Sequence, residues 1–404
     1  MRNILFIGFC VENSDFVNYS KSDKNNQVAA WKLESRYIQG MIECGCRVTS
    51  IASFAASTYP NNNKIIFGFG CNKVSSEWRI FSSAFVNLPG IKLLSRLLST
   101  IALLGVIFFR NRCRPSSVVI YSLHQPYIVA GLIAKAIFRS KIYVIVPDMP
   151  LLMRTGAKTN IFIACFKKID NKLLSWGSAF IDGASFICAA MRPQFPLLAR
   201  NSVVIDGIVA SPVPPINGCQ VRSSSFSKKR VILYTGQLVE SYGVKLLLGA
   251  ASCLPKDYEI WIAGAGEMSV EVARVASENE QLRYLGMLSA EGLAAAYNQA
   301  TLLINPRLLD AEFVKFSFPS KLLEYLMSGV PVLTSRLPSI QEDLIPFFSF
   351  IDDLSVSGVA NAIQATCSAH YAHSLHVALR ARIYVSESRS PISQVKRLLS
   401  IMDV

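Results

Sequence analysis

The sequence lacks the cysteine and histidine patterns that hold metal ions. Its ten cysteines are scattered, and Cys44 and Cys46 form a lone C-x-C without a second pair. A structural zinc site takes four ligands at characteristic spacings, so zinc is not expected here. Several cysteines lie within apolar runs, where a free thiol behaves as a small hydrophobic side chain. This distribution is typical of a protein in a reducing compartment.

Long hydrophobic runs are also missing. The apolar stretch LLSTIALLGVIFF between Arg96 and Arg110 is uncharged and has 13 residues, fewer than the roughly 20 that a spanning helix needs. The apolar run at 4–11 lacks the cleavage site and length of a signal sequence. We therefore expect a buried first strand and no transmembrane segment.

Charged residues are scarce, and basic residues outnumber acidic ones. Charged residues make up 17% of the chain against 51% apolar residues, and mean hydropathy is +0.35. A chain of 404 residues with this composition is globular and long enough for two domains. The net charge of +14 calls for an acidic partner. No nucleic-acid motif is present, whereas an anionic membrane leaflet fits the hydropathy better.

Short β-branched or aromatic runs alternate with helical patterns almost throughout. This pattern predicts an α/β protein with two doubly wound, Rossmann-like domains facing each other across a cleft. A Pro- and Ser-rich segment at 211–229 is expected to link them. In the first half we expect strands at 4–9, 47–51, 118–121 and 142–146, and helices at 29–43, 126–138 and 160–174. In the second half we expect strands at 231–235, 258–263, 283–285, 301–305, 330–333 and 348–351, and helices at 244–254, 268–279, 290–299, 320–328 and 356–365.

The stretch NPRLLDAEFVKFSFPSKLLEYLMSGVPV at 305–332 is the most informative. A strand ends, a loop follows, and Pro319 and Ser320 begin a helix that Gly329 ends. The free amides of its first turn suit a diphosphate, and Lys321 and Arg307 add positive charge. The alternative is a plain surface helix with a solvated lysine.

The segment FSFPSKLLEYLMSGVPV resembles the donor-site helix of glycosyltransferase family 4, the retaining family with the GT-B fold. More narrowly, it is similar to the bacterial polysaccharide-assembly branch with an FPSK-x-x-EY signature. The likeness continues through ILYTGQLVESYGVKLLLGA, IWIAGAGE and YLGMLSAEGLAAAYNQATLLINPR. In the first half it is thinner, in VIVPDMP, FICAAM and VVIDGIV.

The resemblance implies a nucleotide sugar bound to the second domain. Glu324 would bind the ribose, and Ser320 and Lys321 would face the diphosphate. Gly236 and Gln237 would lie under the phosphates. The backbone at Met287 and Leu288 would hold the base. No metal or other cofactor is implied, because cations and helix amides offset the leaving-group charge. The domains would be 1–210, joined by a C-terminal helix at about 385–404, and 230–384.

Three positions depart from the family pattern. Phe316 stands where a glutamate is usual, with Glu312 and the donor-site candidate Lys315 close by. The basic pair after the first glycine turn is replaced by Gln237 and Tyr242, so Arg307 and Lys321 are candidates to supply the charge.

The third departure is on the acceptor side, where Pro147 and Asp148 replace a histidine. Asp148 follows a strand and is a candidate to recognise or activate the acceptor hydroxyl; the alternative is a turn or N-cap aspartate. His124 also ends a strand and is a second catalytic candidate, although a lone histidine there is often structural.

The apolar helix expected at 90–109 carries Lys92, Arg96 and Arg110 at its flanks. It is either a membrane contact at the inner face of the cytoplasmic membrane or a buried helix of the first domain.

Together these features predict retaining sugar transfer from a UDP- or GDP-sugar to a glycan or lipid-diphosphate-linked acceptor. Two alternatives stay open. A nucleotide-sugar epimerase would need more acid and base residues than Asp148 and His124. A partner subunit without catalysis would explain the departures at Phe316 and the basic pair.

Overall fold

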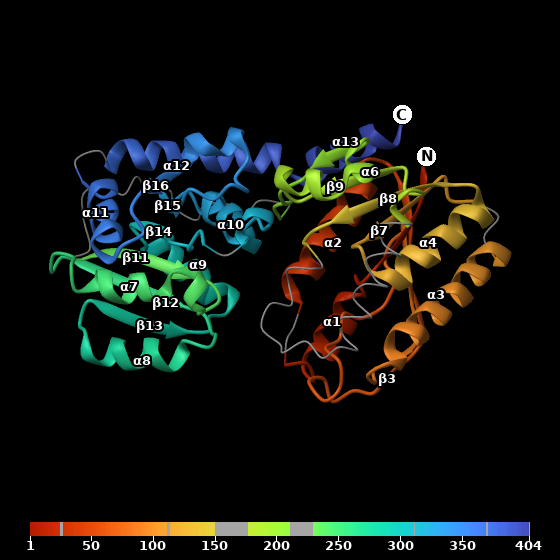
Figure 1. Cartoon of the computed structure of the whole chain (residues 1–404), viewed down its shortest axis with the longest axis horizontal. Coiled ribbons are helices and arrows are strands. Elements are labelled where there is room, and N and C mark those ends of the chain that lie inside the picture. Colours follow the sequence, from red (N-terminus) through yellow and green to blue (C-terminus); the bar gives the residue numbers. More distant parts are fainter. Residues whose placement is uncertain are drawn as a thin grey trace. The chain divides into compact units, whose positions relative to one another are not determined.

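The computed structural model describes residues 1–24, 27–110, 114–149, 177–210, 229–310, 312–368 and 371–403. The chain forms two compact units (Figure 1). The first comprises Met1–Ala210 with Ser390–Val404, and the second comprises Ser211–Arg389. The helix expected at 160–174 and nearly all of the linker expected at 211–229 lie outside the described residues.

The first unit is built on an eight-stranded sheet, counted over the described residues, with the order β10-β9-β8-β7-β1-β2-β5-β4. Its strands run parallel except β4, which pairs antiparallel with β5. The four strands expected from sequence are present, because their continuous apolar runs are buried on both faces. The strands are β1 (Asn3–Gly8), β2 (Arg47–Ala52), β4 (Gly70–Lys73), β5 (Trp78–Ser82), β7 (Ser117–Tyr121), β8 (Lys141–Val146), β9 (Gly183–Phe186) and β10 (Ser202–Val204), with a separate β3 (Ile66–Phe67) and β6 (Phe85–Val86) pair.

Helices cover both faces of this sheet. α2 (Val28–Glu43) and α13 (Pro391–Met402) pack on one face with Ile4, Phe6 and Val48. α3 (Ile91–Arg110) and α4 (Gln125–Phe138) lie side by side on the other (Figure 1). The remaining helices are α1 (Asn13–Ser20), α6 (Pro196–Ala199) and the 3-10 helix η1 (Ala189–Gln194).

The C-terminal helix α13 belongs to the first unit although the whole of the second unit precedes it in the chain. It packs against α2 at Gly40, where a Cβ would lie 2.4 Å from the carbonyl oxygen of Pro391. The chain returns to the first unit at Ser390, later than the expected residue 385. The reason is that α12 (Tyr371–Ser388) continues to Ser388.

The second unit contains a parallel sheet with the order β13-β12-β11-β14-β15-β16. All its strands and five of its helices were expected from the alternating pattern, within a few residues of their observed ends; α12 was not. The strands are β11 (Arg230–Thr235), β12 (Tyr258–Ala263), β13 (Leu282–Gly286), β14 (Leu302–Asn305), β15 (Val332–Ser335) and β16 (Ser349–Ile351). The helices are α7 (Val244–Ala251), α8 (Ser269–Glu278), α9 (Ala290–Gln299), α10 (Ser320–Ser328), α11 (Val356–Thr366) and α12, with 3-10 helices η2 (Glu240–Tyr242), η3 (Glu312–Phe316) and η4 (Glu342–Phe347).

Each sheet has one point where the strand order reverses. In the first unit it lies between β1 and β7, and in the second between β11 and β14. Loops leaving the carboxyl ends of the two strands diverge there, and doubly wound folds bind their ligands in the resulting crevice. These two points are therefore the expected ligand sites of the two units.

Candidate functional site

Two glycine turns form the base of the reversal point in the second unit. Gly264 has a φ of +142°, and a Cβ there would lie 1.8 Å from the carbonyl oxygen of Gly236. Gly243 begins α7 with a φ of +77°, and a Cβ there would lie 1.9 Å from the carbonyl oxygen of Pro306. Only glycine therefore fits at these two positions.

Arg307 follows β14 directly and is only 5% exposed. Its guanidinium carbon lies 4.0 Å from the ring centroid of Tyr242, yet its Nε and Nη1 atoms have no hydrogen-bond partner among the described residues. Burial lowers the pKa of Arg307 from its ordinary value. A buried cation without an anion is costly, so this arrangement fits a site that an anion completes.

The helix α10 begins at Ser320 after Pro319 and ends at Gly329, which has a φ of +71°. These are the helix ends that the sequence predicted. Leu322, Leu323 and Leu326 form its buried face. The free amides of the first turn point along the helix axis, out of its N-terminal end.

Tyr325 ties this helix to the first glycine turn. Its buried hydroxyl accepts a hydrogen bond from the Thr235 amide at 2.8 Å and donates to the Thr235 carbonyl oxygen at 3.1 Å. Thr235 is the last residue of β11 and directly precedes Gly236. This tyrosine was missed at the level of sequence, although it follows Glu324 in the resembling segment.

We expect Tyr325→Phe to loosen the donor-site helix. The substitution leaves the Thr235 amide unpaired in a buried position, which costs about 1–3 kcal/mol. The melting temperature and the affinity for nucleotide should both fall. Tyr371→Phe is the control, because it removes a hydroxyl that donates to the carbonyl oxygen of half-buried Thr301 at 3.0 Å, away from the helix start. Equal behaviour of the two variants would show that Tyr325 does not position α10.

The other donor-site candidates lie around this edge. Lys321 Nζ donates to Glu324 Oε2 at 2.5 Å, one turn along the helix, and both side chains are 36% exposed. The structure thus joins these two candidates to each other. Of the rest, Gln237, Ser320 and Lys315 are exposed, while Gly236 and Leu288 are half-buried.

Position 316 is the main departure from the expected pattern. Phe316 ends the 3-10 helix η3 and is half-buried. Lys315 beside it is exposed. Nothing in the described contacts gives either residue the role of the usual glutamate.

On the acceptor side, Asp148 and His124 follow the neighbouring strands β8 and β7. Burial raises the pKa of Asp148 to about 6. Burial lowers the pKa of His124 well below its ordinary value, with further lowering by Arg96 and Lys92. The His124 ring lies between Phe9, at 5.2 Å, and Tyr127, at 4.9 Å, and its Nε2 has no partner among the described residues. Both residues therefore sit at the reversal edge, with His124 neutral.

Glu34 is a buried carboxyl group that the sequence analysis missed. It is 0% exposed, and its Oε2 accepts hydrogen bonds from the amides of Phe9 at 2.8 Å and Cys10 at 3.0 Å. Its Oε1 has no partner within the described parts of the chain. The helical period contained the signal, because Glu34 shares the buried face of α2 with Tyr37, Ile38 and Met41.

Two of the expected flanking charges of α3, Arg96 and Lys92, turn inward. Arg96 is 3% exposed and donates to the Phe54 carbonyl oxygen at 2.5 Å. Lys92 donates to the carbonyl oxygen of Ala56 at 2.5 Å, and burial lowers its pKa to about 8. These two cations stabilise loop carbonyls rather than face a membrane.

The outer face of α3 is apolar instead. Ile91, Leu94, Leu98 and Phe109 are between 51% and 86% exposed and recur at helical spacing. By length and composition alone α3 could cross a membrane, with 33% of the window buried. Core helices of soluble proteins can have the same length and composition.

Residues 229–365 match the protein family described as glycosyl transferases group 1. The matched segment contains both glycine turns, Arg307 and the whole of α10. No match was found among curated proteins. Within the described residues, no group of three or more His, Cys, Asp or Glu side chains is placed to hold a metal ion.

Solved structures extend the likeness to the entire chain. Sucrose-phosphate synthase from Thermosynechococcus elongatus has a TM-score of 0.64 at 11% identity, over 100% of this chain and 98% of that chain. HepE of Anabaena, in complex with UDP, has a TM-score of 0.63 at 15% identity over 100% of both chains. The apo lipopolysaccharide outer core galactosyltransferase WaaB has a TM-score of 0.61 at 15% identity over 99% of both.

The chain therefore has the GT-B fold, with two Rossmann-like α/β domains. The match over 229–365 indicates a glycosyltransferase enzyme.

Proposed function

We propose that this protein transfers a sugar, with retention of configuration, from a UDP- or GDP-sugar to a glycan or lipid-diphosphate-linked acceptor. The pathway we propose is bacterial cell-surface polysaccharide synthesis, such as capsule or O-antigen. The FPSK-x-x-EY signature at 318–325 supports this branch.

The observation that carries the donor side is buried Arg307 with two unpartnered nitrogens. A guanidinium presents paired N–H groups that match two phosphate oxygens. It follows β14 at the reversal point, across from Gly236 after β11. In this proposal Arg307 binds the diphosphate in place of the missing basic pair at Gln237 and Tyr242.

Donor binding also uses α10. The amides of Ser320 and Lys321 donate hydrogen bonds to the remaining phosphate oxygens at the positive end of the helix. Lys321 leaves its ion pair with Glu324 for the diphosphate, and the freed carboxylate accepts hydrogen bonds from the ribose. Transfer then needs no metal, because fixed cations and amides stabilise the leaving diphosphate.

The acceptor side is assigned to the first unit. Asp148, with a pKa of about 6, changes charge near neutral pH and suits recognition or activation of an acceptor hydroxyl. Neutral His124 lines the same edge. The apolar outer face of α3, together with the positive net charge, supports a peripheral position on the cytoplasmic side of the membrane.

Nucleotide release by the purified chain tests this proposal, using UDP- and GDP-sugars with and without a short lipid-diphosphate-sugar acceptor. We expect release that depends on acceptor and falls at least about 100-fold in Glu324→Ala. Glu278→Ala is the matched control, because Glu278 is also an exposed helix carboxylate paired with a cation, Arg274.

Binding of nucleotide without release from any donor would favour a partner subunit without catalysis. An altered sugar without acceptor would instead favour an epimerase. Either result would overturn the proposal.

A further inference from the structure

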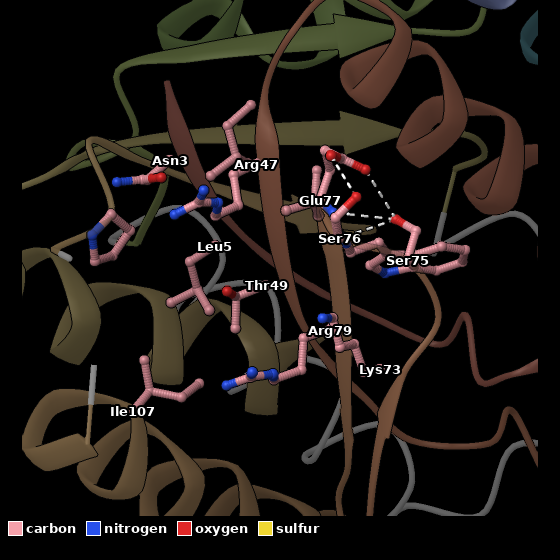
Figure 2. Close-up of a pocket in the computed structure, with 14 residues that line it drawn as sticks. Asn3, Leu5, Arg47, Thr49, Lys73, Ser75, Ser76, Glu77, Arg79 and Ile107 are labelled. Atoms are coloured by element: carbon pink, nitrogen blue, oxygen red, sulfur yellow. Dashed lines mark hydrogen bonds between the residues drawn. The ribbon is translucent and has the colours of Figure 1, made fainter. Parts of the chain in front are cut away.

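The first unit has a pocket at the opposite edge of its sheet from the reversal point. It lies at the amino ends of β1, β2 and β5, beside the last turns of α3, and has a volume of about 400 Å³ (Figure 2). None of the candidate donor or acceptor residues lines it. Its walls are Asn3, Ile4, Leu5, Arg47, Val48, Thr49, Lys73, Ser75, Ser76, Glu77, Trp78, Arg79, Ile107 and Pro115.

Strand register places the charged side chains of this pocket on one face of the sheet. Thr49 of β2 lies opposite Arg79 of β5, and Arg79 lies opposite Lys73 of β4. Arg47 precedes Thr49 by two residues, so it points to the same face. Figure 2 shows the guanidinium groups of Arg47 and Arg79 extending to the same side, with the Thr49 hydroxyl between them.

The cations have too little negative charge around them. Lys73 and Arg79 are exposed, and neither side chain makes a hydrogen bond or ion pair with any residue that the structure describes. The one carboxylate in the pocket wall, Glu77, accepts hydrogen bonds from Ser76 at 2.5 Å and Ser75 at 3.4 Å. Lys73 and Arg79 are like charges directly opposite each other in an antiparallel pair. Such a pair destabilises the sheet.

We propose that this pocket binds a phosphate group, carried either by a soluble phosphoester or by a lipid headgroup. Two guanidinium groups, one ammonium group and a hydroxyl match the charge of about −2 and the several acceptor oxygens of a phosphate. A carboxylate ligand carries a single negative charge, so it would offset only one of the three cations. Leu5 and Ile107 in the wall give the carbon part of an ester an apolar contact.

The test compares two double variants of the full chain that remove the same charge. Lys73→Gln with Arg79→Gln empties the pocket of two cations. Lys32→Gln with Arg200→Gln removes two exposed cations elsewhere on the same unit. Inorganic phosphate is titrated calorimetrically, and vesicles of phosphatidic acid in phosphatidylcholine are tested by co-sedimentation.

We expect the pocket variant to lose at least tenfold in affinity for phosphate, for the vesicles, or for both, while the control variant keeps wild-type affinity. Loss with phosphate identifies a soluble ligand, and loss only with vesicles identifies a headgroup. Equal affinity of the two variants for both probes, or no binding by the wild type to either, would overturn the proposal.

The like-charge pair gives an independent readout. Lys73→Gln should raise the melting temperature in low salt without phosphate, and added phosphate should abolish that gain by stabilising the wild type. A gain that persists unchanged with phosphate would contradict occupation of the pocket.

Discussion

Arg307→Met should abolish tight nucleotide binding without destabilising the protein. Two charge-assisted hydrogen bonds of about 1.5–3 kcal/mol each correspond to a loss of roughly 100-fold or more in affinity for UDP or GDP. The substitution also removes a buried charge whose Nε and Nη1 atoms have no hydrogen-bond partner among the described residues, and it keeps an unbranched side chain against Tyr242. Its melting temperature should therefore equal or exceed that of the wild type.

Arg336→Met is the matched control. The Arg336 guanidinium lies 4.3 Å from the ring centroid of Phe350, much as Arg307 lies over Tyr242, but it is exposed and paired with Asp352. Calorimetric titration of the nucleotide and thermal unfolding report both effects. A destabilised Arg307→Met that still binds nucleotide would show that Arg307 is a structural residue.

Glu34→Ala should severely destabilise the first unit. It leaves the buried amides of Phe9 and Cys10 without their shared acceptor and opens a cavity beneath the loop after β1. Together these effects cost about 3–5 kcal/mol, which lowers the melting temperature by roughly 10 °C for a unit of this size. Thermal unfolding at pH 7 measures the loss, and a change under about 2 °C by that same scale would contradict the loop-anchoring role.

Glu34→Gln separates the hydrogen bonds from the charge. Burial raises the pKa of Glu34 well above its ordinary value of 4.5, so the wild type loses stability as pH rises from there toward the folded-state pKa. The substituted glutamine keeps an acceptor for both amides and cannot ionise. The melting temperature of the variant relative to the wild type should therefore increase with pH over this interval. A constant difference would mean that Glu34 titrates normally.

Much of the fold could be predicted because buried parallel strands appear in the sequence as continuous apolar runs. Runs such as 118–121 and 142–146 are apolar on both faces and separated by helices. The strands β4, β5, β9 and β10 were missed. Polar or small residues interrupt their apolar runs, as in GCNK of β4 and GASF of β9, so neither strand stands out as a continuous apolar run. The helix α12 was missed because its apolar residues do not gather on one side.

The candidate site could be predicted where residues such as proline and glycine mark the ends of a helix. It was less predictable where tertiary contacts decide the position of a side chain. Pro319 and Gly329 bound α10 as expected. The inward turn of Arg96 depends on a carbonyl at Phe54, which lies 42 residues earlier in the chain. The buried state of Arg307 likewise depends on Tyr242, on a different element. Side-chain pairs of this kind are set by how elements pack, which local patterns do not encode.

The mass of the acceptor is the most direct test of sugar transfer. A short lipid-diphosphate-sugar acceptor is incubated with the chain and the nucleotide sugar that gives the strongest release, and the acceptor is then analysed by mass spectrometry. We expect an increase by one sugar residue that requires donor and enzyme together and disappears in Arg307→Met but not in Arg336→Met. An acceptor of unchanged mass, from a chain that binds or alters the nucleotide sugar, would show that the protein is not a transferase acting on this class of acceptor.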